Sequence, residues 1–171
     1  MRHVIGVLVE NEFGALSRIS GLFSGRGFNV ESLTVAETDD PEISRMTIVT
    51  LGDNQIIEQI TKQLNKLINV IKVIDFTETD HVIRGLMLVK VSVEGSKRLE
   101  VLKLIEVFRA RVIDMAAKSA IIEITGNYEK LKAFLDVLAP YGIKEVNGTG
   151  VVAMNREVKA RTRNIYKTRV A

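Results

Sequence analysis

Cysteine and tryptophan are absent from this sequence, and histidine occurs only twice among its 171 residues. Without cysteine, disulfides, thiol catalysis and cysteine-ligated zinc are all excluded. His3 and His81 lie far apart, and neither belongs to an H-x-x-x-H or H-x-x-E-H pattern, so we expect no metal site. No G-x-S-x-G motif surrounds any serine. We therefore expect no catalytic residues in this chain.

Long hydrophobic runs are also missing. No stretch of 18 apolar residues exists, and the start shows no charged segment followed by an apolar one. We therefore expect a cytoplasmic protein that neither spans nor binds a membrane. Hydrophobic residues still make up 46% of the chain, which is enough for a folded core. Aromatic residues are few, so this core must consist mostly of Val, Ile and Leu.

Positive charge is concentrated at the C-terminus. The net charge is +3, but residues 155–171 contain six Lys or Arg and only one acidic residue, Glu157, which gives +6 − 1 = +5. The rest of the chain therefore carries 3 − 5 = −2. A basic tail of this kind is typical of a solvated terminal segment. The alternative is a docking arm for an acidic partner or nucleic acid.

Residues 1–77 alternate between strand and helix patterns. Short runs rich in Val, Ile and Leu indicate the strands, and apolar residues at spacings of three and four indicate the helices. Asp53 is placed to cap the second helix, and Gly25-Arg26-Gly27 to end the first. The order is βαββαβ, which is typical of a ferredoxin-like domain. The expected strands cover 3–9, 28–37, 44–51 and 70–76, and the expected helices begin near residue 14 and at Asp53.

The same order recurs after a polar linker over residues 78–82. Residues 83–154 predict a second βαββαβ domain, with Ser96 and Asn127 as helix caps and a hairpin near Lys118. The expected strands cover 83–93, 111–117, 119–125 and 142–153. The fold class is therefore α+β, with two ferredoxin-like domains in tandem followed by the tail.

The strands of the first domain are apolar on both faces. Consecutive apolar residues occur in Val7-Leu8-Val9 and in Ile48-Val49, although two helices can cover only one face of the sheet. The second face must be covered by the other half of the chain or by another copy of it. From this pattern we predict a homodimer, with sheets joined edge to edge or face to face.

Two apparent motifs have simpler explanations. Residues 148–153 match G-x-G-x-x-A, but no helix, later strand or acidic residue follows at the spacing that a dinucleotide site requires. Arg26-Gly27-Phe28 resembles the start of an RNA-binding motif, but the aromatic residues needed for base stacking do not follow. We therefore expect no nucleic-acid partner, and an RNA-binding ferredoxin-like protein remains a third class of function.

The loop between the first strand and the first helix is the best candidate for a binding site. It delivers Asn11 and Gly14 to a helix N-terminus, where free N–H groups and the helix dipole favour an anion such as a carboxylate. An amide from Asn11 or Asn29 could bind an ammonium or a carboxylate. The apolar lining would come from Ala15, Leu16 and Val30. The alternative is that Asn11 only caps the helix and Gly14 only permits the turn.

Several segments together resemble a known family. They are Asn11-Glu12 with Gly14-Ala15-Leu16, Arg26–Val35 (RGFNVESLTV), Ser44–Ile48 (SRMTI), Glu106–Ala110 (EVFRA), Ile113-Asp114 and Gly150–Met154 (GVVAM). They resemble the ACT-domain family and, more specifically, the small regulatory subunits of acetolactate synthase (acetohydroxyacid synthase). The similarity covers residues 2–154.

The resemblance implies an N-terminal ACT domain over 1–77 in a non-catalytic subunit that activates a separate catalytic subunit. That large subunit is expected to carry thiamine diphosphate, FAD and Mg²⁺, whereas this chain binds no cofactor. The complex would make acetolactate for valine, isoleucine and leucine biosynthesis and would be subject to feedback inhibition by valine. The alternative is a stand-alone ACT-type amino-acid sensor that regulates another enzyme.

The resemblance also implies where valine binds. The site would lie between two ACT domains of a homodimer and would combine two sets of residues from different chains. One chain would contribute Asn11, Gly14, Ala15 and Leu16, and the other Asn29 and Val30. Phe13 departs from the family pattern, in which a smaller residue or proline is common, and this substitution could alter the choice of effector.

Overall fold

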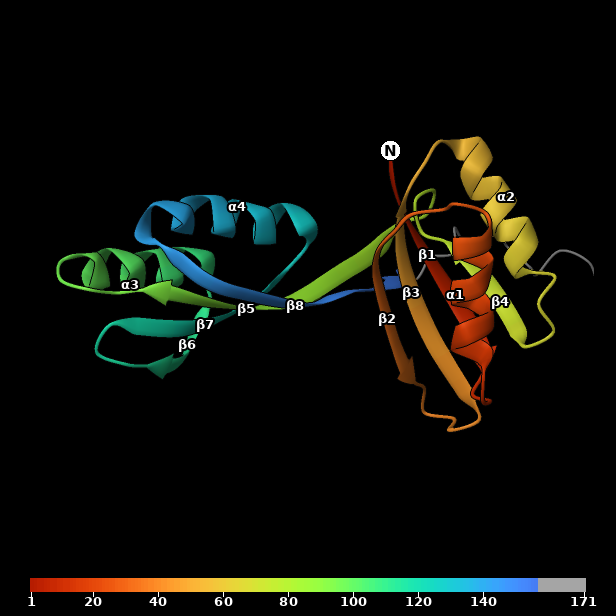
Figure 1. Ribbon diagram of the computed structural model, residues 1–171, viewed down its shortest axis with the longest axis horizontal. Coiled ribbons are helices and arrows are strands. Elements are labelled where there is room, and N and C mark those ends of the chain that lie inside the picture. Colours follow the sequence, from red (N-terminus) through yellow and green to blue (C-terminus); the bar gives the residue numbers. More distant parts are fainter. Residues whose placement is uncertain (157–171) are drawn as a thin grey trace, which may run out of the picture.

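The computed structural model describes residues 1–156, which form two similar units (Figure 1). The N-terminal unit contains a four-stranded antiparallel sheet of order β2-β3-β1-β4. The predicted βαββαβ order is confirmed. Its elements are β1 (Arg2–Glu10), α1 (Ala15–Gly25), β2 (Val30–Glu37), β3 (Ile43–Leu51), α2 (Asn54–Leu64) and β4 (Val70–Asp75).

The C-terminal unit repeats this topology, with strand order β6-β7-β5-β8. The predicted hairpin near Lys118 is confirmed, because it lies between β6 and β7. The elements are β5 (His81–Ser92), α3 (Lys97–Phe108), β6 (Arg111–Met115), β7 (Ser119–Gly126), α4 (Tyr128–Leu138), a short 3₁₀ helix (Ala139–Tyr141) and β8 (Ile143–Asn155). Residues 148–153 lie inside β8 and open no helix, as expected.

Each unit has its own apolar core between its sheet and its two helices. In β1 the side chains of Ile5, Val7 and Val9 point to one face, as the period of a strand requires, and meet Ile19 of α1 and Ile60 of α2. In the C-terminal unit, Val89 and Val91 of β5 meet Phe134 of α4 in the same way. These periodicities explain why the sequence pattern alone is sufficient to order the elements.

Two of the three predicted helix caps are confirmed. The Asp53 carboxylate accepts a hydrogen bond from the Ile56 N–H at 2.9 Å, and the Asn127 side chain accepts one from Lys130 N–H at 3.1 Å. The prediction for Ser96 is wrong. Its backbone is already helical, with φ −64° and ψ −25°, and its hydroxyl makes no cap bond. An N-cap side chain reaches the first N–H groups from an extended backbone, and Ser96 does not have one.

The predicted end of α1 is also confirmed. Gly27 adopts φ +70°, and the Phe28 N–H donates to the carbonyl of Phe23 at 3.0 Å. The Gly27 N–H donates to the Ser24 carbonyl at 3.2 Å. This pair of bonds is the Schellman arrangement, in which glycine accommodates the left-handed conformation. It turns the chain sharply into Asn29 and β2.

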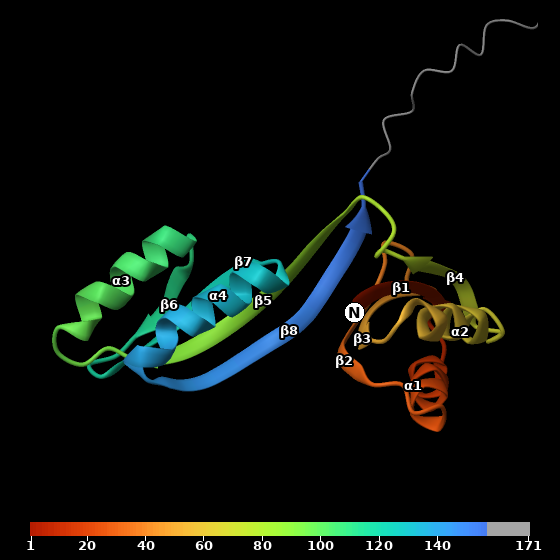
Figure 2. The same cartoon turned by 90° about the horizontal axis from the view of Figure 1, so that it is seen from above.

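The second face of the N-terminal sheet is covered by the C-terminal unit. Strands β5 and β8 extend beyond their own sheet and lie against the face opposite α1 and α2 (Figure 2). Ala153 of β8 packs in one buried cluster with Val4, Val49 and Phe76. Thr34 donates a hydrogen bond to the Thr149 carbonyl at 2.9 Å. The other half of the chain thus covers the second apolar face of the N-terminal sheet, which was one of the two possibilities that the sequence pattern left open.

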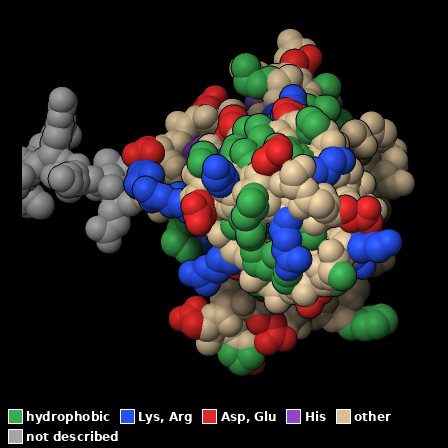
Figure 3. Space-filling model, turned by 90° about the vertical axis from the view of Figure 1, so that its left-hand side faces the viewer, with side chains coloured by type: hydrophobic (Ala, Val, Ile, Leu, Met, Phe, Trp, Pro, Cys, Tyr) green, Lys and Arg blue, Asp and Glu red, His purple; other side chains and the backbone are tan. Residues whose placement is uncertain are grey.

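The far end of the C-terminal unit exposes hydrophobic side chains among lysine and arginine (Figure 3). On the elements at that end, Leu99, Val107 and Ile113 are exposed.

The basic segment was predicted to begin at residue 155, and its residues from 157 onward lie outside the described part of the chain. Arg156 forms an ion pair with Asp80 at 3.2 Å. Within residues 1–156, no helix is long and apolar enough to cross a membrane.

The two polar residues that precede α3 and α4 allow a matched test of capping. Asn127→Ala should lower the free energy of unfolding of the C-terminal unit by about 1 kcal/mol, because it removes the bond to Lys130 N–H. Ser96→Ala should change it by less than about 0.5 kcal/mol, since no cap bond is lost. Urea unfolding followed by circular dichroism would measure both, and equal losses would contradict the assignment.

Candidate functional site

The loop before α1 leaves the start of that helix open. Gly14 occupies the N-cap position with φ +86°, no side chain caps the helix, and no acidic residue lies in its first turn. A Cβ atom placed on Gly14 would meet nothing within 4 Å. Glycine is therefore required by the backbone conformation, and the space beside it is free. The helix dipole and the first N–H groups make this space suitable for an anion.

Asn11 holds the loop against the β2–β3 hairpin and does not cap the helix. Its side-chain amide donates to Glu37 Oε1 at 3.1 Å and to the Pro41 carbonyl at 2.9 Å. Its amide oxygen accepts a hydrogen bond from the Ser44 hydroxyl at 3.0 Å. The alternative that Asn11 is only a helix cap is therefore wrong. Both amide hydrogens are engaged, so a bond from this side chain to a ligand would replace one of them.

Asn69 supports the same loop from the other side, and the sequence pattern did not reveal it. This side chain is only 5% exposed. Its amide donates to the carboxylates of Glu10 at 3.2 Å and Glu12 at 2.9 Å, and its amide oxygen accepts from Arg18 of α1. Asn69 precedes β4 at a position where asparagine is common in turns. Only the contacts distinguish it from a turn former.

The apolar residues predicted at the site point in different directions. Ala15 is buried in the core below α1, whereas Leu16 is partly exposed on the outer side of the helix. Phe13 is fully exposed at the tip of the loop. Leu16 and Phe13 therefore offer apolar surface near the open helix start, and Ala15 contributes close packing beneath it.

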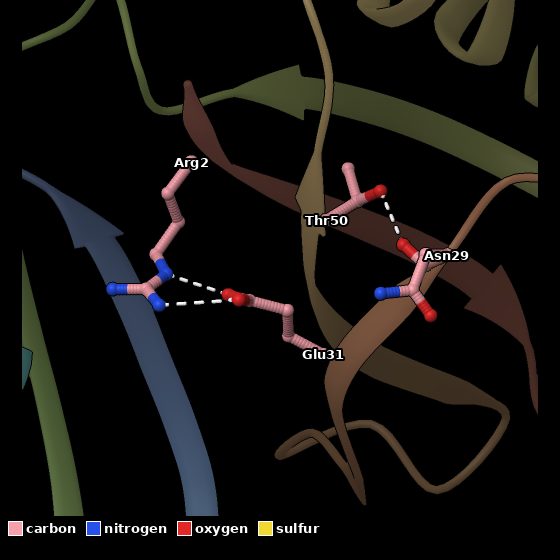
Figure 4. A network of polar contacts seen from close by, with 4 residues as sticks. All are labelled: Arg2, Asn29, Glu31 and Thr50. Carbon is pink, nitrogen blue, oxygen red and sulfur yellow. Dashed lines mark hydrogen bonds and ion pairs between the residues drawn. The ribbon is translucent and has the colours of Figure 1, made fainter.

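Asn29 lies at the opposite end of the sheet from Asn11. Its carbonyl accepts a hydrogen bond from the buried hydroxyl of Thr50 at 2.5 Å (Figure 4). Strands β1 and β2 both run antiparallel to β3, so they are parallel to each other. Asn29 is therefore beside the start of β1, and Asn11 is at its end. Seven residue steps along β2, from Val30 to Glu37, correspond to about 23 Å.

Strand β2 forms an edge of the N-terminal sheet, and this edge is apolar. It pairs with β3 on one side only. Val30, Leu33 and Val35 are 37%, 37% and 42% exposed, which is unusual for strand residues of this type. An edge strand with unpaired backbone groups and apolar side chains is suited to pairing with another strand. Asn29 and Val30 mark one end of this edge, and Asn11 contacts Glu37 at the other.

A second polar arrangement lies between the two units. The Arg2 guanidinium binds the Glu31 carboxylate through two hydrogen bonds, from Nε at 2.6 Å and Nη2 at 3.1 Å (Figure 4). Its Cζ lies 3.6 Å from the centre of the Tyr128 ring at the start of α4. The hydrogen bonds from Arg2, together with its charge, lower the pKa of the Glu31 carboxyl, and the same hydrogen bonds raise the pKa of Arg2. Nothing in the sequence pattern predicted this contact.

These residues lie at a cavity of about 410 Å³ between the units. Apolar side chains line most of it, including Val4, Ile83, Leu131 and Leu135. The start of α4 and the N-terminal sheet thus approach each other, but their side chains do not fill the space between them. Among residues 1–156, no group of three or more His, Asp or Glu side chains is placed to hold a metal ion.

Comparisons with known proteins agree with the fold and with its division into two units. Residues 5–72 match the family described as "AHAS small subunit-like ACT domain", and residues 84–157 match "Small subunit of acetolactate synthase". A probable acetolactate synthase small subunit of Archaeoglobus fulgidus is 52% identical over 156 residues, covering 91% of this chain and 98% of the relative. The acetolactate synthase small subunit of Mycolicibacterium smegmatis is 49% identical, covering 90% and 91%.

A solved structure shows the same fold. The acetolactate synthase small subunit of Thermotoga maritima is 40% identical and superimposes with a TM-score of 0.83, covering 91% of this chain and 98% of that one. The agreement extends over both units, so their order along the chain is shared.

The role of Asn11 in the loop can be tested in the isolated protein. Asn11→Ala removes three hydrogen bonds to the β2–β3 hairpin, so the amides of residues 10–16 should exchange with deuterium about tenfold faster or more. The middle of α1 should remain protected, since its core contacts are unchanged. Mass spectrometry of exchange would measure this. An unchanged rate in the loop would contradict the role.

Proposed function

This chain belongs to the family of acetolactate synthase small subunits, and we propose that it acts as a regulatory subunit that binds valine. In this proposal it associates with a separate catalytic subunit, raises its activity and makes it sensitive to feedback by valine in branched-chain amino acid biosynthesis. The observation that carries the proposal is the placement of the two predicted half-sites. They lie at opposite ends of one apolar edge strand, so a single chain cannot complete the site.

A two-fold pairing of β2 with β2 of a second copy would bring the half-sites together. Antiparallel pairing centred near Leu33 and Thr34 would place Asn29 and Val30 of one chain beside Glu37 of the other. Glu37 is hydrogen-bonded to Asn11. The pairing would satisfy the free backbone groups of both edges and would join two four-stranded sheets into one. Exposed Val30, Leu33 and Val35 would become buried, which favours the dimer.

The completed site would match each part of valine. The carboxylate would bind at the open start of α1 beside Gly14, where the helix dipole favours it. The Asn29 side chain, which makes no hydrogen bond within the described residues, would be free to bind the ammonium or the carboxylate from the second chain. Leu16 and Val30 would contact the branched side chain, with Phe13 close to the rim.

Valine would act by shifting the population of dimer arrangements. A ligand that contacts both chains binds best to the arrangement that holds the two half-sites at the correct distance. It can change the equilibrium only by its difference in affinity for the two arrangements, typically about 1–3 kcal/mol or 5- to 150-fold. The catalytic subunit would respond to this shift. Thiamine diphosphate, FAD and Mg²⁺ would belong to that subunit, in the cytoplasm, and this chain would bind none of them.

The direct test compares the acetolactate synthase activity of the catalytic subunit alone and with this chain, across a valine titration. We expect this chain to raise the activity of the catalytic subunit, and we expect increasing valine to reverse that rise in activity. A chain that neither associates with the catalytic subunit nor alters its activity would contradict the proposal. It would instead favour a stand-alone sensor for another enzyme.

The edge pairing predicts the effect of a charge on β2. Val35→Lys should dissociate the dimer, raising its dissociation constant about tenfold or more, because it would bury a charge opposite the partner strand. The exposed Val107 on α3 provides a matched control, and Val107→Lys should leave the dimer intact. Analytical ultracentrifugation of the isolated chain would measure both. A dimer unaffected by Val35→Lys would place the interface elsewhere.

The anion site predicts the effect of a carboxylate at Gly14. Gly14→Asp should raise the valine concentration for half-maximal inhibition about tenfold or more, since like charges a few ångströms apart repel by about 1–4 kcal/mol. Activation without valine should persist. Gly95→Asp is the control, because Gly95 also has a positive φ and open space at Cβ but lies in the C-terminal unit. Unchanged inhibition in Gly14→Asp would exclude this site.

A further inference from the structure

The contact of Arg2 with Glu31 and Tyr128 joins the starts of three elements, two in the N-terminal unit and one in the C-terminal unit. Arg2 is at the start of β1, Glu31 is near the start of β2, and Tyr128 begins α4 in the other unit. The two hydrogen bonds to Glu31 use the fork of the guanidinium, and the flat face of the same group lies over the Tyr128 ring. Bidentate pairs of this kind are geometrically demanding. The position of Arg2 over Tyr128 therefore depends on where the Glu31 carboxylate is held.

Glu31 immediately follows the half-site on β2. Asn29 and Val30 precede it, and the register between β2 and β3 shifts between Val30 and Ser32. A register irregularity leaves one residue unpaired with the neighbouring strand, and here this residue is Glu31. The Thr50 hydroxyl holds the Asn29 carbonyl on the other side (Figure 4). A change in backbone position at Asn29 and Val30 would therefore reach the Glu31 carboxylate before any other acidic group.

Tyr128 borders an unfilled space between the two units. The two units approach each other closely along β8, where Gly150 is so near the N-terminal sheet that a Cβ would lie 2.8 Å from Thr34 Oγ1. Beside this contact lies the cavity of about 410 Å³, which Gly150 lines together with Tyr128 and Leu131 of α4. Packed interiors transmit displacement, whereas an unfilled space allows it. The contact of Thr34 with Thr149 and Gly150 can thus act as a pivot about which α4 approaches or leaves the N-terminal sheet.

We propose that Arg2 couples the effector site on β2 to the C-terminal unit, with Glu31 positioning its guanidinium against Tyr128. This coupling rests on the proposed function, because it requires valine at Asn29 and Val30. Valine would move Glu31, Arg2 would follow, and the contact with Tyr128 would change. Arg2, Glu31 and Tyr128 are positioning residues in this scheme and do not touch the effector. The contact would transmit the state of the dimer interface to α4.

The lack of tryptophan in the chain provides a specific probe. Tyr128→Trp places the one tryptophan of the variant over Arg2, and tryptophan also binds a cation with its ring face. A valine titration should produce a saturable change in its emission, with a midpoint equal to the dissociation constant measured by calorimetry. Tyr141→Trp is the control. Tyr141 lies at the far end of the unit, hydrogen-bonded to Glu100 at 3.0 Å, and its emission should not respond.

Glu31→Gln then tests the link itself, because it keeps the shape of the side chain and removes its charge. In the Tyr128→Trp background it should reduce the emission change by about half or more, while valine affinity stays within about threefold. In the complex with the catalytic subunit it should leave activation in place and weaken maximal inhibition by valine. Circular dichroism and ultracentrifugation would establish that both variants remain folded and dimeric.

The outcomes separate the two proposals. If calorimetry detects no valine binding to the original chain, the proposed function is wrong, and the coupling that depends on it is wrong as well. If valine binds but the emission at position 128 does not change, or changes equally with Glu31→Gln, the coupling alone is wrong. A loss of valine affinity in Glu31→Gln as large as the loss of inhibition would place Glu31 in the effector site and would also overturn the coupling.

Discussion

The N-terminal sheet is apolar on both faces, and the rest of the structure follows from the need to cover both. Helices α1 and α2 bury one face through Ile5, Val7 and Val9. The extended ends of β5 and β8 cover the other, where Ala153 meets Val4, Val49 and Phe76. Burial of these apolar side chains favours the packing of the two units against each other. Strand β2 remains exposed at one edge of the sheet.

The functional features that we propose lie along that edge. Strand β2 carries exposed Val30, Leu33 and Val35, and the two half-sites lie at its two ends. A regulatory site divided between the ends of an edge strand exists only when two copies pair. Effector binding would then require assembly, and a ligand that contacts both copies would favour one arrangement of the dimer over another. The same strand contains Glu31, so the edge is also connected to the second unit through Arg2 and Tyr128.

The sequence was sufficient for the order of the elements and for several of their ends. Short apolar runs predicted the strands, and Asp53, Asn127 and Gly27 marked helix ends correctly, because caps and glycine turns depend on neighbours a few residues away. Ser96 failed as a cap because a hydroxyl caps only from an extended backbone, and the backbone there had already become helical after Gly95. The homodimer and the choice of valine remain predictions that the experiments above address.

Local composition therefore determined the fold class, the repeat of two similar units and the unusual loop at Asn11 and Gly14. Tertiary structure alone decided which surface covers the second face, since an apolar strand pattern does not identify its partner. It also decided that Asn11 binds the β2–β3 hairpin and does not cap α1, that Asn69 supports the loop, and that Arg2 lies between Glu31 and Tyr128. These contacts join residues 26 to 126 positions apart, and hydrogen bonds over such separations leave no periodic signal in the sequence.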